Sequence, residues 1–397
     1  MMRAWAIGIA AIMFLSTSAL PNASDVLPSV PPNVLQLLRS NDQIQIKSKL
    51  EISKPILTFH QQFLVLVRYG VAGKPLRKSK YRQLHFVLRV KDEQGNWYQG
   101  AQYSSFEVPE QFKNGDIEFS TSVYLRPGTY QFAIGLLESA TGHANVNHLV
   151  ITVPPPKKDR IPQINELLPP VEFPASMPDS KGMWPISLQM ARLSLPGRNR
   201  QLDILLNVTK ASRSDWLYRR QTEEVLAIGS VLGRLSLPDG CVRVSVIDAL
   251  RTKIVLDRQN ADQIDWGKLQ ASIEELDQNT IDISALENQR RVAEFTQRFI
   301  EGLARDTKGC TSSPNEEPVT AVISADLVLP LGAKIPRSPL RELTDVYYFH
   351  VGTGSAWMDG VGQILSSAKA RKMNCSNPLK AREGIAEFIT SLSTVAD

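Results

Sequence analysis

The sequence is poor in the residues that build most recognisable catalytic and metal centres. Its 397 residues include three cysteines and five histidines, and the cysteine spacings match no zinc-binding motif. No Gly-x-Ser-x-Gly segment marks the nucleophile of an α/β-hydrolase, and no pair of carboxylates is placed for acid–base work. The segment Gly352-Thr353-Gly354-Ser355 lacks the ending of a phosphate-binding loop and predicts a plain turn. These absences argue against an enzyme whose active site can be read from its sequence.

The chain also has little excess of positive over negative charge. The formal net charge is +5 and 21% of the residues are charged, and the excess is spread along the chain, which argues against a nucleic-acid-binding protein. The densest basic run lies between two predicted strands, and we expect a solvated loop there. The alternative is that it contacts an anionic polymer of the cell envelope or lipid headgroups. The run comprises Lys74, Arg77, Lys78, Lys80 and Arg82.

Only the start of the chain contains a long apolar run. The segment from Ala4 to Leu15 is continuously apolar, and Thr17 and Ala19 stand where a cleavage site needs small residues, which is typical of a signal peptide over residues 1–19. A membrane anchor is the alternative, but the run is short for crossing about 30 Å of hydrocarbon as a helix. No later segment is long and apolar enough to span a membrane. We therefore expect an exported bacterial protein that is periplasmic or extracellular.

Residues 43–153 show short strand patterns separated by turn signals. Several segments alternate apolar and polar residues, which is the period of a half-buried strand, and their number predicts an antiparallel β-sandwich of immunoglobulin-like size. The segment from Arg126 to Tyr130 (RPGTY) resembles a corner found in many exported immunoglobulin-like and fibronectin-like modules, which implies that the Tyr130 ring lies in the core. The predicted strands are 43–52, 63–69, 84–90, 117–125, 129–137 and 148–153.

Residues 154–185 are dense in proline, with Pro154, Pro155, Pro156, Pro162, Pro169, Pro170, Pro174, Pro178 and Pro185. This density predicts a linker without regular helix, extended and semi-rigid. The alternative is an extended strap that lies along one of the domains.

From residue 186 to residue 393 the pattern changes to strands alternating with helices. Strands that are apolar throughout predict a mostly parallel sheet with helices on both faces. The predicted fold class is therefore α+β and multidomain, with an antiparallel β-sandwich followed by a doubly wound α/β domain. The predicted strands are 202–208, 241–247, 253–257, 319–324, 346–351 and 372–375. The predicted helices are 214–234, 266–276, 283–305, 358–370 and 378–392.

This order of elements resembles the von Willebrand factor type A domain, in the degenerate form found beside a β-sandwich in exported bacterial proteins. The family binds a divalent metal through loops at the carboxyl ends of its strands, and the first loop normally reads Asp-x-Ser-x-Ser. Here that loop reads Asn207-Val208-Thr209-Lys210-Ala211, so the acid has become an amide and the second hydroxyl has been lost. The resemblance also implies ligand positions at Thr280 in the second loop and Asp326 in the third.

These departures weaken the implied metal site, which would comprise Asn207, Thr209, Thr280 and Asp326. Mg²⁺ prefers hard oxygen ligands with carboxylate charge, and only Asp326 supplies such a charge. We therefore expect the site to hold no metal and the protein to need no cofactor, with Mg²⁺ as the ion the site would take. Asn207 and Thr209 would instead cap the following turn, and Asp326 would accept backbone N–H bonds.

The three cysteines, Cys241, Cys310 and Cys375, meet oxidising conditions in an exported protein. In a doubly wound sheet, strands begin and their preceding helices end on the same edge, which brings Cys241 and Cys310 together. We expect a Cys241–Cys310 disulfide, with Cys375 buried and free. The alternative is three separate reduced thiols.

The fold family and the missing catalytic groupings together favour a binding or scaffolding role. We expect protein–protein or adhesive contacts in the cell envelope or outside the cell, with an unknown protein partner. The alternative is an unrecognised envelope hydrolase that uses the α/β domain.

Overall fold

The computed structural model of the chain describes residues 30–39, 43–73, 83–109, 116–157, 159–174, 192–195, 201–209, 215–237, 240–278, 289–306, 318–327, 343, 345–352 and 359–394. The predicted signal peptide, the basic run from Lys74 to Arg82, Thr280 and Cys310 lie outside these residues. Within them, no helix has the length and apolarity needed to cross a bilayer. The described residues form an α+β protein.

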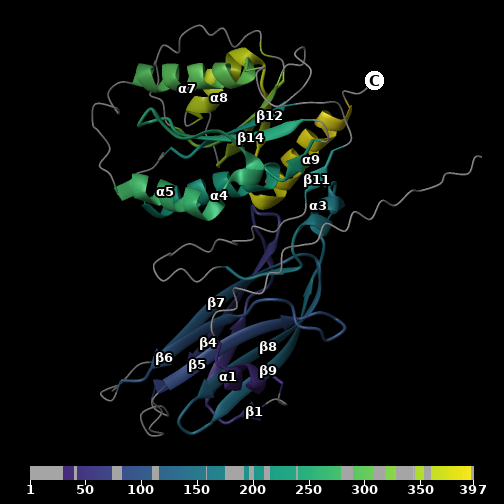
Figure 1. Cartoon of the computed structure of the whole chain (residues 1–397), viewed down its shortest axis with the longest axis vertical. Helices are drawn as coiled ribbons and strands as arrows, with labels where there is room; N and C mark the ends of the chain where they lie inside the picture. Colours follow the sequence, from purple (N-terminus) through teal and green to yellow (C-terminus); the bar gives the residue numbers. More distant parts are fainter. Residues whose placement is uncertain are drawn as a thin grey trace, which may run out of the picture.

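Two antiparallel sheets form the β domain in the first part of the chain (Figure 1). One sheet has the order β1-β9-β8-β5-β6, and the other has the order β10-β7-β4-β2 with β3 beside β4. The strands are β1 (Gln43–Ile44), β2 (Ser48–Ile52), β3 (Ile56–Leu57), β4 (Phe63–Val71), β5 (Gln83–Lys91), β6 (Gln102–Glu107), β7 (Ile117–Leu125), β8 (Gly128–Glu138), β9 (Ala144–Val153) and β10 (Val171–Glu172).

Apolar side chains of both sheets share one core. Every second side chain of β4 is buried, because successive residues of a strand point to opposite faces. Tyr69 of one sheet meets Phe86 of the other with ring centroids 5.9 Å apart. Tyr130 is 2% exposed, as expected, and its hydroxyl lies 2.9 Å from the carbonyl oxygen of Arg126 and 3.0 Å from that of Pro170.

The short helix α1 (Pro32–Leu37) covers part of the outer face of the first sheet. Val34 and Leu38 are buried there against Val87 of β5 and Ala133 of β8. Neither this helix nor β6 is predicted from the sequence, because each has only six residues and no clear apolar pattern.

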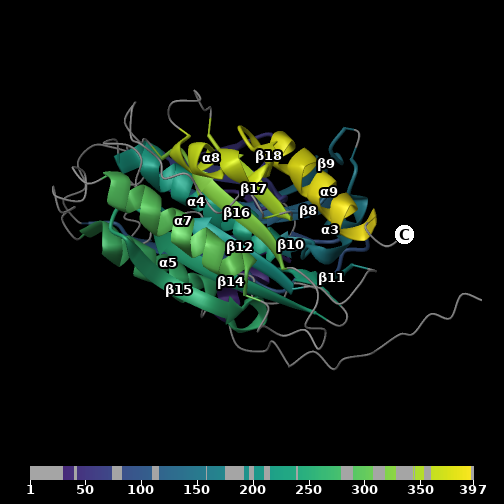
Figure 2. The ribbon, with the colours of Figure 1, turned by 90° about the horizontal axis from the view of Figure 1, so that it is seen from above.

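The second part of the chain forms a six-stranded sheet with the order β15-β14-β12-β16-β17-β18, and most of these strands lie side by side in Figure 2. All neighbours pair in parallel except β15, which is antiparallel to β14. The strands are β12 (Gln201–Asn207), β14 (Cys241–Asp248), β15 (Lys253–Asn260), β16 (Val319–Ala325), β17 (Val346–Val351) and β18 (Arg371–Asn374); β11 (Leu193–Ser194) and β13 (Leu235–Ser236) form a separate small ladder.

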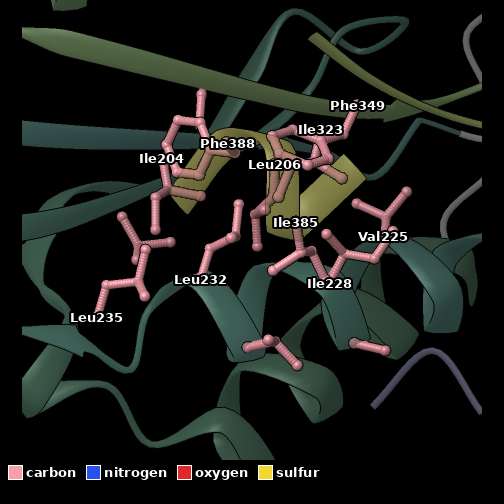
Figure 3. Packing of buried hydrophobic residues seen from close by; sticks show 14 of the residues in the cluster. Ile204, Leu206, Val225, Ile228, Leu232, Leu235, Ile323, Phe349, Ile385 and Phe388 are labelled. Carbon is pink, nitrogen blue, oxygen red and sulfur yellow. The ribbon is translucent and has the colours of Figure 1, made fainter. Parts of the chain in front are cut away.

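Helices cover both faces of this sheet. One face packs against α4 (Asp215–Leu232), α5 (Trp266–Gln278) and α9 (Pro378–Thr394), and the other packs against α7 (Gln289–Ala304) and α8 (Gly360–Leu365). Figure 3 shows the first of these cores, where Ile204 and Leu206 of β12 face Ile228 of α4 and Ile385 of α9. Every residue of β12, β16 and β17 is buried, which explains why most of their residues are apolar.

The proline-rich segment differs from its prediction. It contains a helix, α3 (Pro162–Leu167), and the strand β10, which pairs with β7. The helix forms because Pro162 occupies its first turn, where a missing N–H costs nothing and the fixed φ of proline suits a helix. The segment between Pro154 and Pro174 is therefore packed against the domains and is not a free spacer.

Candidate functional site

Polar side chains gather where three neighbouring parallel strands end. Asn207 of β12 is in register with Ser324 of β16, and Ser324 is in register with His350 of β17. Their exposed fractions are 2%, 0% and 2%. Three buried polar residues in one row, at the end of otherwise apolar strands, need hydrogen-bond partners. We call this region the carboxyl edge.

The side-chain oxygens of the first predicted metal loop belong to one chain of hydrogen bonds. The N–H of Ala249 donates to Thr209 Oγ1 at 2.6 Å, and Thr209 Oγ1 donates to Asn207 Oδ1. Asn207 Nδ2 donates to Ser324 Oγ at 2.9 Å, and Ser324 Oγ in turn donates to the carbonyl oxygen of Ala325 at 2.8 Å. The amide and hydroxyl groups therefore satisfy one another without an ion.

Asp326 has a different environment. It follows β16, is 4% exposed, and its Oδ1 accepts a hydrogen bond from His350 Nε2 at 2.8 Å. Gln221 of α4 reaches its other oxygen at 3.5 Å, and Gln221 Oε1 is buried with no hydrogen-bond partner among the described residues. A Cβ atom on Gly352 would lie 2.8 Å from both carboxylate oxygens, so Asp326 can occupy this position only beside a glycine.

A second carboxylate stands beside the edge. Asp359 caps α8 by accepting the N–H of Gly362 at 2.8 Å, and it also accepts bonds from Tyr348 Oη and Lys372 Nζ, each at 2.5 Å. Burial works to raise the pKa of Asp359, but the bonds from Lys372 and Tyr348 outweigh it and hold that pKa below its usual value. Burial together with the Asp359 charge raises the pKa of Tyr348 well above its usual value, so Tyr348 stays a neutral donor.

The predicted metal ligands that the structure describes belong to two separate hydrogen-bonded groups. Asn207 and Thr209 bond to each other, whereas Asp326 bonds to His350 and Gln221; the fourth ligand, Thr280, lies outside the described residues. Where the chain is described, no group of three or more His, Cys, Asp or Glu side chains is placed to hold a metal. Among the described contacts, the side chains of His350 and Gln221 bond to Asp326, and the expectation that it also accepts backbone N–H groups stays a prediction.

Sequence reasoning missed His350, Ser324 and Gln221. A signal was present for two of them, because His350 and Ser324 are the polar residues near the carboxyl ends of apolar strands. Gln221 gives no such signal, since a glutamine on a helix is usually solvated. The five basic residues of the predicted envelope contact lie outside the described residues.

The opposite end of the same sheet carries charged pairs, and we call it the amino edge. Asp203 of β12 is 1% exposed and accepts two bonds from Arg243 of β14, at 2.7 and 2.9 Å. Asp306, just beyond α7, pairs with Arg243 at 3.2 Å and with Arg258 at 3.1 Å. Cys241 begins β14 at this edge and is disulfide-bonded. Its predicted partner Cys310 lies outside the described residues, so their pairing stays a prediction.

One serine–histidine contact occurs in the β domain. His85 Nε2 lies 3.0 Å from Ser139 Oγ, and His85 Nδ1 lies 2.8 Å from the hydroxyl of Tyr103, whose ring stacks on the imidazole. Burial lowers the pKa of His85, so the ring is a neutral, fully bonded side chain that ties β5 to β6 and to the turn after β8. We interpret it as structural. Labelling of Ser139 by a fluorophosphonate probe would contradict this interpretation.

Comparisons with known proteins identify no family for this chain. No protein-family model matches it, and no curated protein matches it. Among solved structures, a glycosyl hydrolase family 2 member from Bacteroides cellulosilyticus is similar at 11% identity over 70% of this chain and 36% of that chain, with a TM-score of 0.20. A family 123 glycoside hydrolase from Clostridium perfringens is similar at 9% identity over 83% and 72% of the two chains, with a TM-score of 0.24. These scores are too low to transfer either fold or function.

Proposed function

We propose that this chain is an exported bacterial binding or scaffolding protein, with an immunoglobulin-like domain followed by a metal-free domain of the von Willebrand factor A type. In this proposal the carboxyl edge of the parallel sheet faces a protein partner in the cell envelope or outside the cell. The hydrogen-bond network at that edge holds the surrounding loops in place without an ion.

Two features of the fold support the domain types. The six-stranded sheet has the central order of a doubly wound fold, and its third strand in chain order, β15, is the antiparallel edge strand. In the β domain, the hydroxyl of Tyr130 bonds to the carbonyl oxygen of Arg126, four residues earlier, which is the geometry of a tyrosine corner in immunoglobulin-like sandwiches.

The observation that carries the metal-free part of the proposal is the contact between His350 and Asp326. The His350 imidazole donates to Asp326 Oδ1, and the Asn207 and Thr209 oxygens each already accept a hydrogen bond. Mg²⁺ dehydrates reluctantly and usually needs carboxylate ligands, and Asp326 is the only carboxylate in the predicted set of ligands. The polar groups of the carboxyl edge therefore take their hydrogen bonds from one another.

A thermal-shift titration tests this part. We expect millimolar Mg²⁺ or Mn²⁺ to leave the unfolding midpoint of the protein unchanged. A metal present at about 100 times its dissociation constant would stabilise the fold by about 2.7 kcal/mol, which is a shift of several degrees. Such a shift, lost in Asp326→Ala, would show that the edge is a working metal site.

Affinity capture tests the binding part. The mature chain, immobilised and offered to an envelope extract of its own cells, should retain a specific protein. His350→Ala, which removes the partner of Asp326, should reduce that retention, whereas Lys380→Ala on the exposed side of α9 should not. Equal retention by both variants would place the partner elsewhere on the molecule.

A further inference from the structure

The connection between the two domains crosses their junction three times. The chain leaves the β domain after β9, and Ile164 of α3 and its flanking residues Ile161 and Leu168 then pack into the core of the α/β domain. It returns to the β domain as β10, which pairs with β7, and then crosses again to reach β11. In Figure 1, α3 lies beside α9 and β11 at the boundary between the domains. We call residues 154–174 the strap.

A hairpin of the β domain also enters the junction. Phe59, between β3 and β4, is 7% exposed and belongs to the hydrophobic core that otherwise comprises the α/β domain and α3. Gln61, two residues later, has a φ of 66° and is fully buried. A non-glycine residue in this conformation is held there by its surroundings.

Arg382 of α9 joins all three parts. Its guanidinium donates to both carboxylate oxygens of Asp159, at 2.8 and 2.7 Å, and to the carbonyl oxygen of Ile161 at 3.2 Å. It also donates to Asn165 Oδ1 at 3.1 Å and to Gln61 Oε1 at 3.3 Å. Arg382 is 4% exposed, so one buried side chain bonds the last helix to the strap and to the β3–β4 turn.

The charges at this contact are balanced. Burial works to raise the pKa of Asp159, but the hydrogen bonds from Arg382 and the N–H of Ile161 outweigh it and lower that pKa, so Asp159 is the anion that Arg382 needs. Next to Gln61, burial and the nearby Arg234 lower the pKa of His60 to about 3. His60 therefore adds no positive charge beside Arg382 at neutral pH.

We infer that Arg382, bound to the strap and to the β3–β4 turn, locks the two domains into one rigid body. The domains then unfold together and do not rotate about a hinge, and a force applied to one is transmitted to the other. A bidentate arginine–carboxylate pair whose side chains are 4% and 11% exposed has the geometry that such a lock needs. The inference does not depend on the proposed binding function.

Trypsin cleavage of the strap tests the lock, because Lys157 and Arg160 are exposed cleavage residues within it. In the wild type, cleavage there should be slow and the protein should unfold calorimetrically in one transition. Arg382→Ala should speed cleavage about 100-fold, because cleavage follows the population of the opened strap and the variant leaves the largely shielded Asp159 carboxylate without its partner. It should also separate the unfolding into two transitions.

Matched variants keep the test decisive. Lys380→Ala lies on the same helix, is exposed and loses only its pair with Glu383, so its strap should be cleaved at the wild-type rate. If Arg382→Ala does not fold, Gln61→Ala combined with Asn165→Ala removes two bonds of Arg382 and the bond from Asn165 to Asp159. Asp159 keeps Arg382 as its partner, and cleavage should still rise several-fold. Rapid cleavage of the wild-type strap, two wild-type transitions, or an unchanged cleavage rate in these variants would overturn the inference.

Discussion

The two ends of the parallel sheet provide their buried polar groups with different kinds of partner. The amino edge uses full charges, with Asp203 and Asp306 set against Arg243 and Arg258. The carboxyl edge uses amide and hydroxyl groups around Asn207, together with a single carboxylate bonded to His350. Strand ends in α/β folds place ligand sites at the carboxyl edge, so the charges at the amino edge are best understood as structural. The carboxyl edge carries fewer charged pairs, with Asp326 bonded to His350 and with Asp359 paired to Lys372 beside it.

The largest effect should follow from breaking the amino edge. Arg243→Ala leaves Asp203 buried without its bidentate partner, and we expect a loss of about 3–5 kcal/mol in the free energy of unfolding. Urea unfolding at neutral pH measures this. Arg243→Lys keeps the charge but loses the paired geometry, and should fall between the variant and the wild type. A loss below about 1 kcal/mol in Arg243→Ala would mean that the pair is solvated and worth little.

The disulfide at the amino edge should have a comparable effect. A Cys241–Cys310 bridge closes a loop of about 70 residues, and opening it should cost about 4 kcal/mol by the chain-entropy model, less any strain. Unfolding with and without reductant gives this difference, and non-reducing peptide mapping identifies the partner of Cys241. A bridge that contained Cys375, or three free thiols, would show the predicted pairing to be wrong.

Breaking the carboxyl edge should cost less. Asp326→Asn removes the charge that His350 binds, and we expect a loss of about 1.5–3 kcal/mol, as for a hydrogen bond to a charged group. Asn207→Ala removes only neutral bonds and should cost about 1 kcal/mol. The ratio of these losses to that of Arg243→Ala is the quantity to measure. If Asp326→Asn destabilised the protein as strongly as Arg243→Ala, the contrast between the two edges would disappear.

The smallest effect concerns the free thiol near the carboxyl edge. Cys375 is fully buried, and burial raises the pKa of its thiol to about 12. Since the thiolate is the reactive form, we expect no measurable alkylation of Cys375 in the native protein at pH 8 and full alkylation after unfolding. Fast native labelling would mean that the strand end opens.

Strands could be predicted more completely than contacts. The limits of β7 follow from its alternating apolar and polar residues, and those of the core strands β16 and β17 follow from apolar runs. The burial of Tyr130 follows from its corner. The contact between His350 and Asp326 could not be predicted, because it depends on the register of β16 against β17, which sequence alone does not state. The helix α3 could not be predicted from composition, because dense proline argues against a helix. The position of Pro162 in the first turn, where proline is tolerated, is visible only in the structure. For the predicted metal site, the sequence identifies the candidate residues. It does not show which of their oxygens already accept hydrogen bonds.

The repeated crossing of the strap affects how this protein can be divided. A boundary placed in the proline-rich segment, where sequence would put it, removes either β10 from the β domain or the apolar residues of α3 from the α/β core. Each isolated piece would then carry an open sheet edge or an uncovered apolar patch, and both favour aggregation. Duplication or exchange of either domain by recombination at this boundary would face the same obstacle. The two domains are therefore expected to be inherited, expressed and engineered as a pair.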